Sequence, residues 1–172
     1  RSTLFPYTTL FRSQPLIEEI EAKNPTGIIL GGGPSIEGAG NSEKYIMHFD
    51  IPILGICLGH QLIAKTYGGE VSTSETESYA QVKININNDE NLFKSLAPKM
   101  TVWSSHKDEV KTMPKEFTIL SSSNLCDVES FKHKDKDVYG IQFHPEVHHT
   151  PKGSVIFENF YNICKERCNN DW

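Results

Sequence analysis

Two short apolar segments that lead into glycines constrain the fold of this chain most. They cover residues 27–30, which precede Gly31-Gly32-Gly33, and residues 51–56. A strand that is apolar on both faces is typical of a parallel sheet buried between two layers of helices. Residues 59–67 follow the second segment with apolar side chains at helical spacing, so strand and helix alternate. The pattern predicts an α/β fold, with an open, mostly parallel sheet and helices on both faces.

The rest of the chain predicts further strands and a closing helix. Residues 81–87 alternate apolar and polar side chains, which is the period of a half-buried strand. Other strands are expected near residues 101–104, 118–121, 128–132 and 138–143, and helices over residues 15–22 and 153–167. A chain of 172 residues is the usual size of one domain.

The N-terminal sequence RSTLFPYTTLFRS resembles the translation of a sequencing-adapter oligonucleotide more than a protein segment. We therefore interpret residues 1–13 as an artefact, and residues 14–172 as one domain truncated at its N-terminus. The missing part would be roughly thirty residues, about one strand–helix unit, so the first strand of the sheet is expected to be missing. Losing a buried parallel strand exposes backbone groups and apolar surface, so we expect the chain as given to be poorly stable.

Composition argues against several classes of function. The net charge is −5, and Lys and Arg do not cluster as they do on surfaces that neutralise phosphates, so no nucleic-acid partner is expected. No apolar run is long enough to span a bilayer, so no membrane role is expected. Four cysteines without a C-x-x-C pair favour a reducing, cytoplasmic setting. His148 and His149 lack partners at zinc-ligand spacing, so no metal site is predicted.

The segment Gly55-Ile56-Cys57-Leu58-Gly59 has the G-x-C-x-G spacing of a nucleophile elbow. In such a turn a strand leads directly into a helix and the central residue points outward. Small residues two before and two after it are needed because the two backbones approach closely. The dipole at the N-terminus of the following helix favours a thiolate. A buried structural cysteine at a strand end is the alternative interpretation.

His144 and Glu146 are the candidate base and carboxylate. They follow an apolar strand two residues apart, so their side chains can point the same way. An imidazole that accepts the thiol proton, held in one tautomer by a carboxylate, would complete a triad. Alternatively, His144 bonds a backbone carbonyl and Glu146 is a solvated loop charge. Catalysis is favoured because both Cys57 and His144 lie at strand ends, where active sites of open parallel sheets occur.

The glycine run after the first apolar segment is a candidate oxyanion hole. Glycines let backbone N–H groups turn toward a ligand. Gly32 or Gly33 could act together with the N–H of Leu58, the residue after the candidate nucleophile. A plain tight turn is the alternative, and the run does not match a dinucleotide-binding fingerprint.

In this order, GGGP, GICLGHQ and FHPE resemble the class I glutamine amidotransferases, and the resemblance covers essentially all of residues 14–172. It implies the fold of that family, with flavodoxin-like layering, and hydrolysis of glutamine through a glutamyl thioester. The implied catalytic residues are Cys57 as nucleophile, His144 as general base and acid, and Glu146 as orienting carboxylate. The implied oxyanion hole is Gly32, Gly33 and Leu58, and the implied glutamine pocket contains Gln61, Ser105, His106 and Lys107. No cofactor is implied in this chain.

Members of this family differ in the enzyme that receives the ammonia. Residues 77–80, 103–110 and 144–150 are similar to members that supply an ATP-dependent synthetase subunit converting XMP to GMP. ATP and Mg would then bind to the partner, and the lack of an ATP-binding domain before Trp172 resembles a two-subunit, archaeal-type heterodimer. The alternatives are a glutaminase for anthranilate or carbamoyl phosphate synthesis, a non-catalytic domain of the same fold, and a hydrolase of γ-glutamyl peptides.

Overall fold

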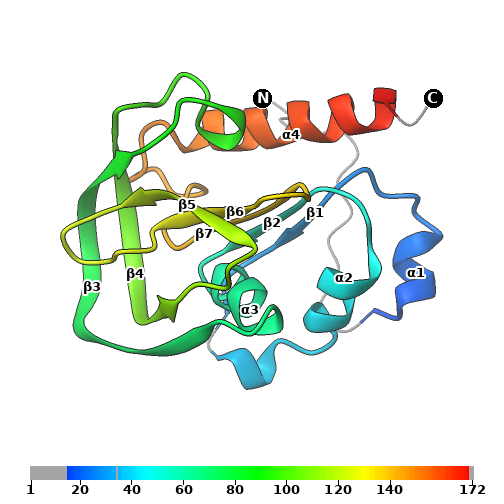
Figure 1. Ribbon diagram of the computed structural model, residues 1–172, viewed down its shortest axis with the longest axis horizontal. Coiled ribbons are helices and arrows are strands. Elements are labelled where there is room, and N and C mark those ends of the chain that lie inside the picture. Colours follow the sequence, from blue (N-terminus) through cyan, green and yellow to red (C-terminus); the bar gives the residue numbers. More distant parts are fainter. Residues whose placement is uncertain (1–14, 34, 171–172) are drawn as a thin grey trace.

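A seven-stranded sheet forms the centre of the computed structural model, which describes residues 15–33 and 35–170 (Figure 1). The strand order is β1-β2-β7-β6-β5-β3-β4. The strands are β1 (Ile28–Leu30), β2 (Ile53–Ile56), β3 (Glu70–Ile86), β4 (Lys99–Thr112), β5 (Phe117–Ser122), β6 (Ser130–His133) and β7 (Val138–Ile141). The artefact assigned to residues 1–13 and the missing first strand concern residues outside the described ranges.

The parallel part of the sheet consists of β1, β2 and β7. All four residues of β2 are buried, as expected for an apolar segment covered on both faces. Gly55 of β2 pairs with Leu30 of β1 on one side and with Gly140 of β7 on the other. The α/β prediction is confirmed here, and the carboxyl ends of these strands lie next to one another.

The prediction of a mostly parallel sheet is wrong beyond these three strands. Four of the six ladders are antiparallel, namely β7–β6, β6–β5, β5–β3 and β3–β4. The physical reason is the length of the connections, because a parallel crossover needs a dozen or more residues, usually with a helix. Only residues 123–129 and 134–137 separate β5, β6 and β7, so these strands reverse direction.

The long β3–β4 ribbon was predicted only in part. Figure 1 shows it as a curved pair of strands at the end of the sheet opposite α1. The expected strand at residues 81–87 corresponds to the second half of β3, and residues 101–104 to the first half of β4. Residues 70–80 are mostly polar and carry no clear alternation. Their strand conformation depends on pairing with β4, which a local pattern cannot indicate.

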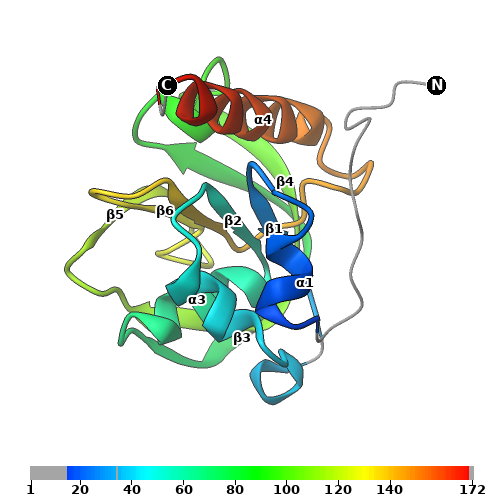
Figure 2. The ribbon, with the colours of Figure 1, turned by 90° about the vertical axis from the view of Figure 1, so that its right-hand side faces the viewer.

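Helices cover both faces of the sheet, as predicted (Figures 1 and 2). One face carries α1 (Ile17–Glu21), α2 (Ser42–His48) and α3 (Leu58–Thr66), and α4 (Gly153–Asn170) lies on the other. The sequence did not predict α2 or the short 3-10 helices η1 (Ile36–Gly38) and η2 (Asn91–Phe93). Across the described residues, every helix is too short or too polar to cross a lipid bilayer.

Two apolar cores lie on opposite faces of β2. Leu54 and Ile56 belong to the core that includes Ile156 and Phe160 of α4. Ile53 belongs to the other core, whose members include residues of α2 and α3. Each fully buried aliphatic side chain stabilises the fold by about 1.5–3 kcal/mol. Packing from both faces therefore fixes β2, and with it the position of Cys57, which follows directly.

Candidate active site

Cys57 is the single residue between β2 and α3, and its backbone is unusual. Its φ is 53° and its ψ is −102°, a region that residues other than glycine rarely adopt. Such conformations cost on the order of 1–3 kcal/mol and are held in place by the surrounding structure. The predicted sharp turn at Cys57 is present, and the side chain stands at the N-terminus of α3.

The glycines on either side of Cys57 are needed for close approach, as predicted. A Cβ built on Gly55 would lie 2.5 Å from the carbonyl carbon and oxygen of Gly59. A Cβ on Gly59 would lie 2.3 Å from the carbonyl oxygen of Leu30. The first turn of α3 therefore rests directly on the backbone of β1 and β2, with no room for a methyl group.

His144 lies beside Cys57 and pairs with Glu146. Nδ1 of His144 is 2.6 Å from Oε1 of Glu146, and the two side chains are 17% and 46% exposed. A hydrogen bond with Cys57, followed by the one with Glu146, raises the pKa of His144 to about 10. Burial opposes ionisation of Glu146, but the hydrogen bond with His144 outweighs it and the pKa of Glu146 is lowered. The structure thus brings Cys57, His144 and Glu146 together.

The candidate oxyanion residues also surround Cys57. The β position of Gly32 is 3.9 Å from Cβ of Cys57 and 3.4 Å from Cε1 of His144. The β position of Gly33 is 2.7 Å from a methyl group of Leu58, the first residue of α3. Any side chain at Gly32 would crowd the space between the thiol and the imidazole, so the absence of one keeps that space open.

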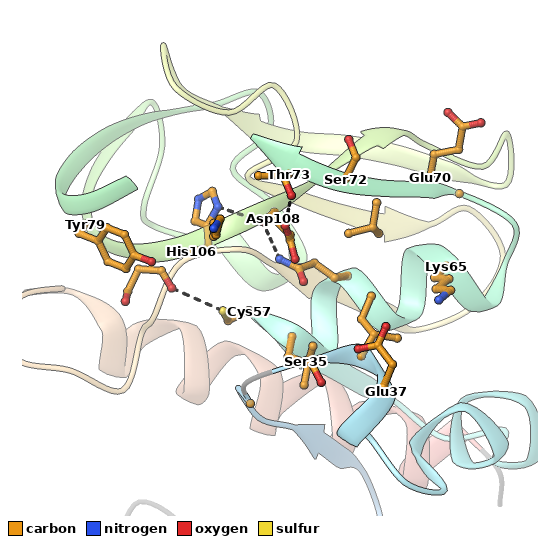
Figure 3. Close-up of a pocket in the computed structure, with 18 residues that line it drawn as sticks. Ser35, Glu37, Cys57, Lys65, Glu70, Ser72, Thr73, Tyr79, His106 and Asp108 are labelled. Carbon is orange, nitrogen blue, oxygen red and sulfur yellow. Dashed lines mark hydrogen bonds between the residues drawn. The ribbon is translucent and has the colours of Figure 1, made fainter. Parts of the chain in front are cut away.

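A cavity of about 720 Å³ opens beside Cys57 (Figure 3). One face of α3 lines it with Leu58, Gln61 and Lys65, which lie at helical spacing, and β4 lines it with residues 105–108. All four residues predicted for the glutamine pocket contribute to its wall, namely Gln61, Ser105, His106 and Lys107. The Cys57 thiol also donates a hydrogen bond to the Ser105 carbonyl oxygen across 3.8 Å.

Gln61 is held by two hydrogen bonds from one end of its side chain. Nε2 donates to the backbone oxygen of Asp108 at 2.7 Å and to Oε1 of Gln142 at 3.2 Å. Both amide protons are therefore engaged, which leaves the amide oxygen to accept a hydrogen bond. An acceptor of this kind, about four residues along α3 from Cys57 and hence about 6 Å away along the helix axis, suits the amino group of an amino acid.

Two histidines near the site are buried and uncharged at neutral pH. Burial lowers the pKa of His106, although its Nδ1 lies 3.1 Å from the Asp108 backbone oxygen. Burial also lowers the pKa of His60 to about 3, and the ring of His60 packs against Phe131 with centroids 4.5 Å apart. His60 thus lies within the core, in keeping with the structural role expected of it.

The part of the cavity wall that lies away from Cys57 was not predicted from the sequence. Figure 3 shows Lys65, Glu37 and Glu70 on that side. These are isolated polar residues of α3, η1 and β3, and no local pattern separates them from ordinary surface charges. Other lining residues that were not predicted are Ser35, Ile36, Ser72 and Thr73. In the described part of the chain, no group of three His, Cys, Asp or Glu side chains is arranged to bind a metal ion.

The pKa of His144 provides a direct test of this geometry. We expect the ring to titrate at about pH 10 in the wild type, and at lower pH in Glu146→Gln and in Cys57→Ala, because each variant loses one stabilising hydrogen bond. The pKa is raised in the folded state, so the protonated ring stabilises the fold fully below its ordinary pKa of 6.5. That contribution is lost as the pH rises through about 10. NMR of the ring nuclei measures the titration, and a wild-type midpoint near 6.5 would contradict the geometry.

Comparisons with known proteins agree with these observations. The family model for "Glutamine amidotransferase class-I" matches residues 2–164. A relative from Methanobrevibacter smithii, described as the glutamine-hydrolyzing subunit of GMP synthase, is 83% identical over 155 residues, which are 90% of this chain and 82% of the relative. A relative with the same description from Methanothermobacter thermautotrophicus is 58% identical over 164 residues, which are 95% of this chain and 85% of the relative.

Solved structures show the same fold. A crystal structure of a protein from Thermoplasma acidophilum matches with a TM-score of 0.85 and 37% identity, over 90% of this chain and 80% of that one. A glutamine amidotransferase from Thermotoga maritima matches with a TM-score of 0.70 over 89% of this chain and 80% of that one. The second pair is 20% identical, so this likeness concerns the fold alone.

Proposed function

This chain belongs to the class I glutamine amidotransferases, and we propose that it is the glutaminase subunit of a two-subunit GMP synthase. The observation that carries the chemical part is the contact of Cys57 with His144, whose other side pairs with Glu146. The relative at 83% identity, described as the glutamine-hydrolyzing subunit of GMP synthase, supports the choice of ammonia acceptor. In this proposal the chain itself needs no cofactor, and ATP and Mg bind to the partner.

The first half of the reaction forms a thioester. The Cys57 thiolate attacks the side-chain amide carbon of glutamine, and the oxygen of that amide becomes negatively charged. Backbone N–H groups of Leu58 and of Gly32 or Gly33 stabilise the oxyanion. Donors of this kind are typically worth about 10²–10³ in kcat. His144 donates its proton to the departing nitrogen, and ammonia leaves as the carbon–nitrogen bond breaks.

The second half regenerates the enzyme. His144, now neutral, accepts a proton from water as that water attacks the thioester. The carbon–sulfur bond breaks, glutamate is released and the thiolate pairs again with the imidazolium. Glu146 holds the ring in one tautomer through both steps because its carboxylate accepts from Nδ1. In the pocket, we propose that Gln61, Ser105, His106 and Lys107 bind the substrate glutamine.

The partner subunit would adenylate XMP with ATP and replace the activated oxygen with ammonia, giving GMP. Ammonia is almost wholly protonated in neutral water and is then no longer a nucleophile. Its transfer must therefore avoid bulk solvent, which requires the two subunits to associate as a heterodimer. Uncoupled hydrolysis would waste glutamine, so we expect low glutaminase activity from the chain alone. The four unpaired cysteines agree with a cytoplasmic location.

Glutamine hydrolysis with and without an XMP-loaded, ATP-dependent synthetase subunit tests the proposal. We expect the partner to raise the rate of glutamate release on the order of tenfold or more, within the range of typical coupling between sites. GMP should form from glutamine in the mixture, and a synthetase incubated without this chain is the control. Stimulation by an anthranilate or carbamoyl phosphate synthesis partner, and not by the XMP-dependent one, would replace the proposed acceptor.

A further inference from the structure

The loop that follows β7 is fastened to β4 by an unusual bridge. His144 and Trp103 form an isolated antiparallel bridge, in which the His144 N–H donates to the Trp103 carbonyl oxygen at 2.9 Å. In an ordinary bridge of this type the two residues also exchange a second hydrogen bond, from the Trp103 N–H to the His144 carbonyl. Here that second connection passes through the side chain of Thr150.

The Thr150 hydroxyl lies between the two backbone groups. It accepts a hydrogen bond from the Trp103 N–H at 2.9 Å and donates one to the His144 carbonyl oxygen at 2.6 Å. The Thr150 residue is 3% exposed, so the hydroxyl is shielded from bulk water. A hydroxyl is suited to this place because a single atom can donate and accept at once. The inserted oxygen sets the spacing between His144 and β4.

The same stretch of β4 also carries part of the active site. Ser105, two residues after Trp103, supplies the carbonyl oxygen that accepts from the Cys57 thiol. The bridge therefore relates the backbone of His144 to the strand that already contacts Cys57. Thr150 is also the end of the loop that carries Glu146, and its own N–H donates to the Val147 carbonyl at 3.0 Å. One side chain thus fixes both ends of the segment that bears the base and the carboxylate.

We propose that Thr150 is a positioning residue whose hydroxyl aligns the His144 imidazole with the Cys57 thiol. This role rests on the proposed function and adds to it a residue outside the triad. Thr150 does not contact the reacting atoms, and it acts through the backbone of His144. Without the hydroxyl, a buried N–H and a buried carbonyl would lose their partners, and the bridge would move until both were satisfied in another way.

The test compares Thr150→Val with Thr150→Ser. Valine keeps the volume and removes both hydrogen bonds, while serine keeps the hydroxyl and removes only a methyl group. We expect valine to lower kcat/KM for glutamine by about 100-fold, the effect of a displacement near 1 Å. The loss should lie mainly in kcat, and the His144 titration should move to lower pH. Serine should restore most of the activity and the wild-type titration.

The outcomes separate positioning from general loop stability. A lower Tm with unchanged kcat and unchanged His144 titration would overturn the proposal, as would a serine variant as impaired as valine. If the valine variant does not fold, Thr150→Ala replaces it with the same expected falls, and wild-type values would overturn the proposal in the same way. The NMR titration needs neither substrate nor partner, so it can fail or succeed independently of the proposed function. A wild type that cannot hydrolyse glutamine with its partner would instead contradict that function.

Discussion

Replacing Cys57 with alanine should abolish glutamine hydrolysis. We expect kcat to fall on the order of 10⁴-fold or more, as it does when a triad nucleophile is removed from other hydrolases. The sulfur forms the thioester bond, and no other cysteine can replace it, because Cys126 and Cys164 are buried elsewhere and Cys168 lies near the C-terminus of α4. The assay measures glutamate release in the presence of the XMP-loaded partner.

The matched control for this experiment is Cys168→Ala. Its side chain is half-buried near the end of α4, so the variant removes a thiol without approaching the cavity. It should retain wild-type kcat and KM. The Cys57→Ala protein should unfold at a temperature close to the wild type, which separates loss of chemistry from loss of fold. Unchanged hydrolysis by Cys57→Ala would eliminate this residue as the nucleophile and favour a non-catalytic domain.

The second large effect is expected from Gly59→Ala, which should destabilise the fold by about 3 kcal/mol, near the upper end for overpacking. Alanine is intrinsically better than glycine inside a helix by about 1 kcal/mol, so propensity alone predicts the opposite sign. The steric clash should dominate because the new methyl group would lie 2.3 Å from the Leu30 carbonyl oxygen. Leu30 cannot easily withdraw, since it pairs with Gly55 in the β1–β2 ladder.

Denaturant unfolding of Gly59→Ala beside Gly31→Ala measures this effect. A Cβ on Gly31 would meet nothing within 4 Å, so the second variant should be nearly as stable as the wild type. Both changes add one methyl group to a glycine close to the active site, which makes them comparable. If Gly59→Ala were more stable than the wild type, α3 could not lie as close to β1 as the structure places it.

The sequence predicted the parallel part of the fold well because its signal is local. The burial of β2 on both faces follows from an uninterrupted apolar segment, and the turn at Cys57 follows from glycines at fixed spacing. The antiparallel half was mispredicted because strand direction depends on connection length and on pairing between distant residues. The first half of β3 shows this best, since its polar residues become a strand only through their pairing with β4.

The candidate site shows the same division. Cys57, His144 and Glu146 belong to short motifs, so each could be named before its neighbours in space were known. Lys65 and Glu70 line the cavity only because α3 and β3 meet beside it, and neither lies in a motif. The link from Thr150 to Trp103 joins residues 47 positions apart through one hydroxyl. Spacing along the chain carries no information about contacts of this kind.

The burial of β2 between two cores has a consequence for how such an enzyme can diversify. A substitution in β2 must satisfy packing on both sides at once, so few replacements are tolerated where the sulfur is anchored. Glu146 is 46% exposed and belongs to a loop, and the β3–β4 ribbon carries many solvent-facing side chains. Over generations, adaptation to a new ammonia acceptor would therefore be expected to rewrite the loop and the ribbon while leaving the anchoring strand nearly unchanged.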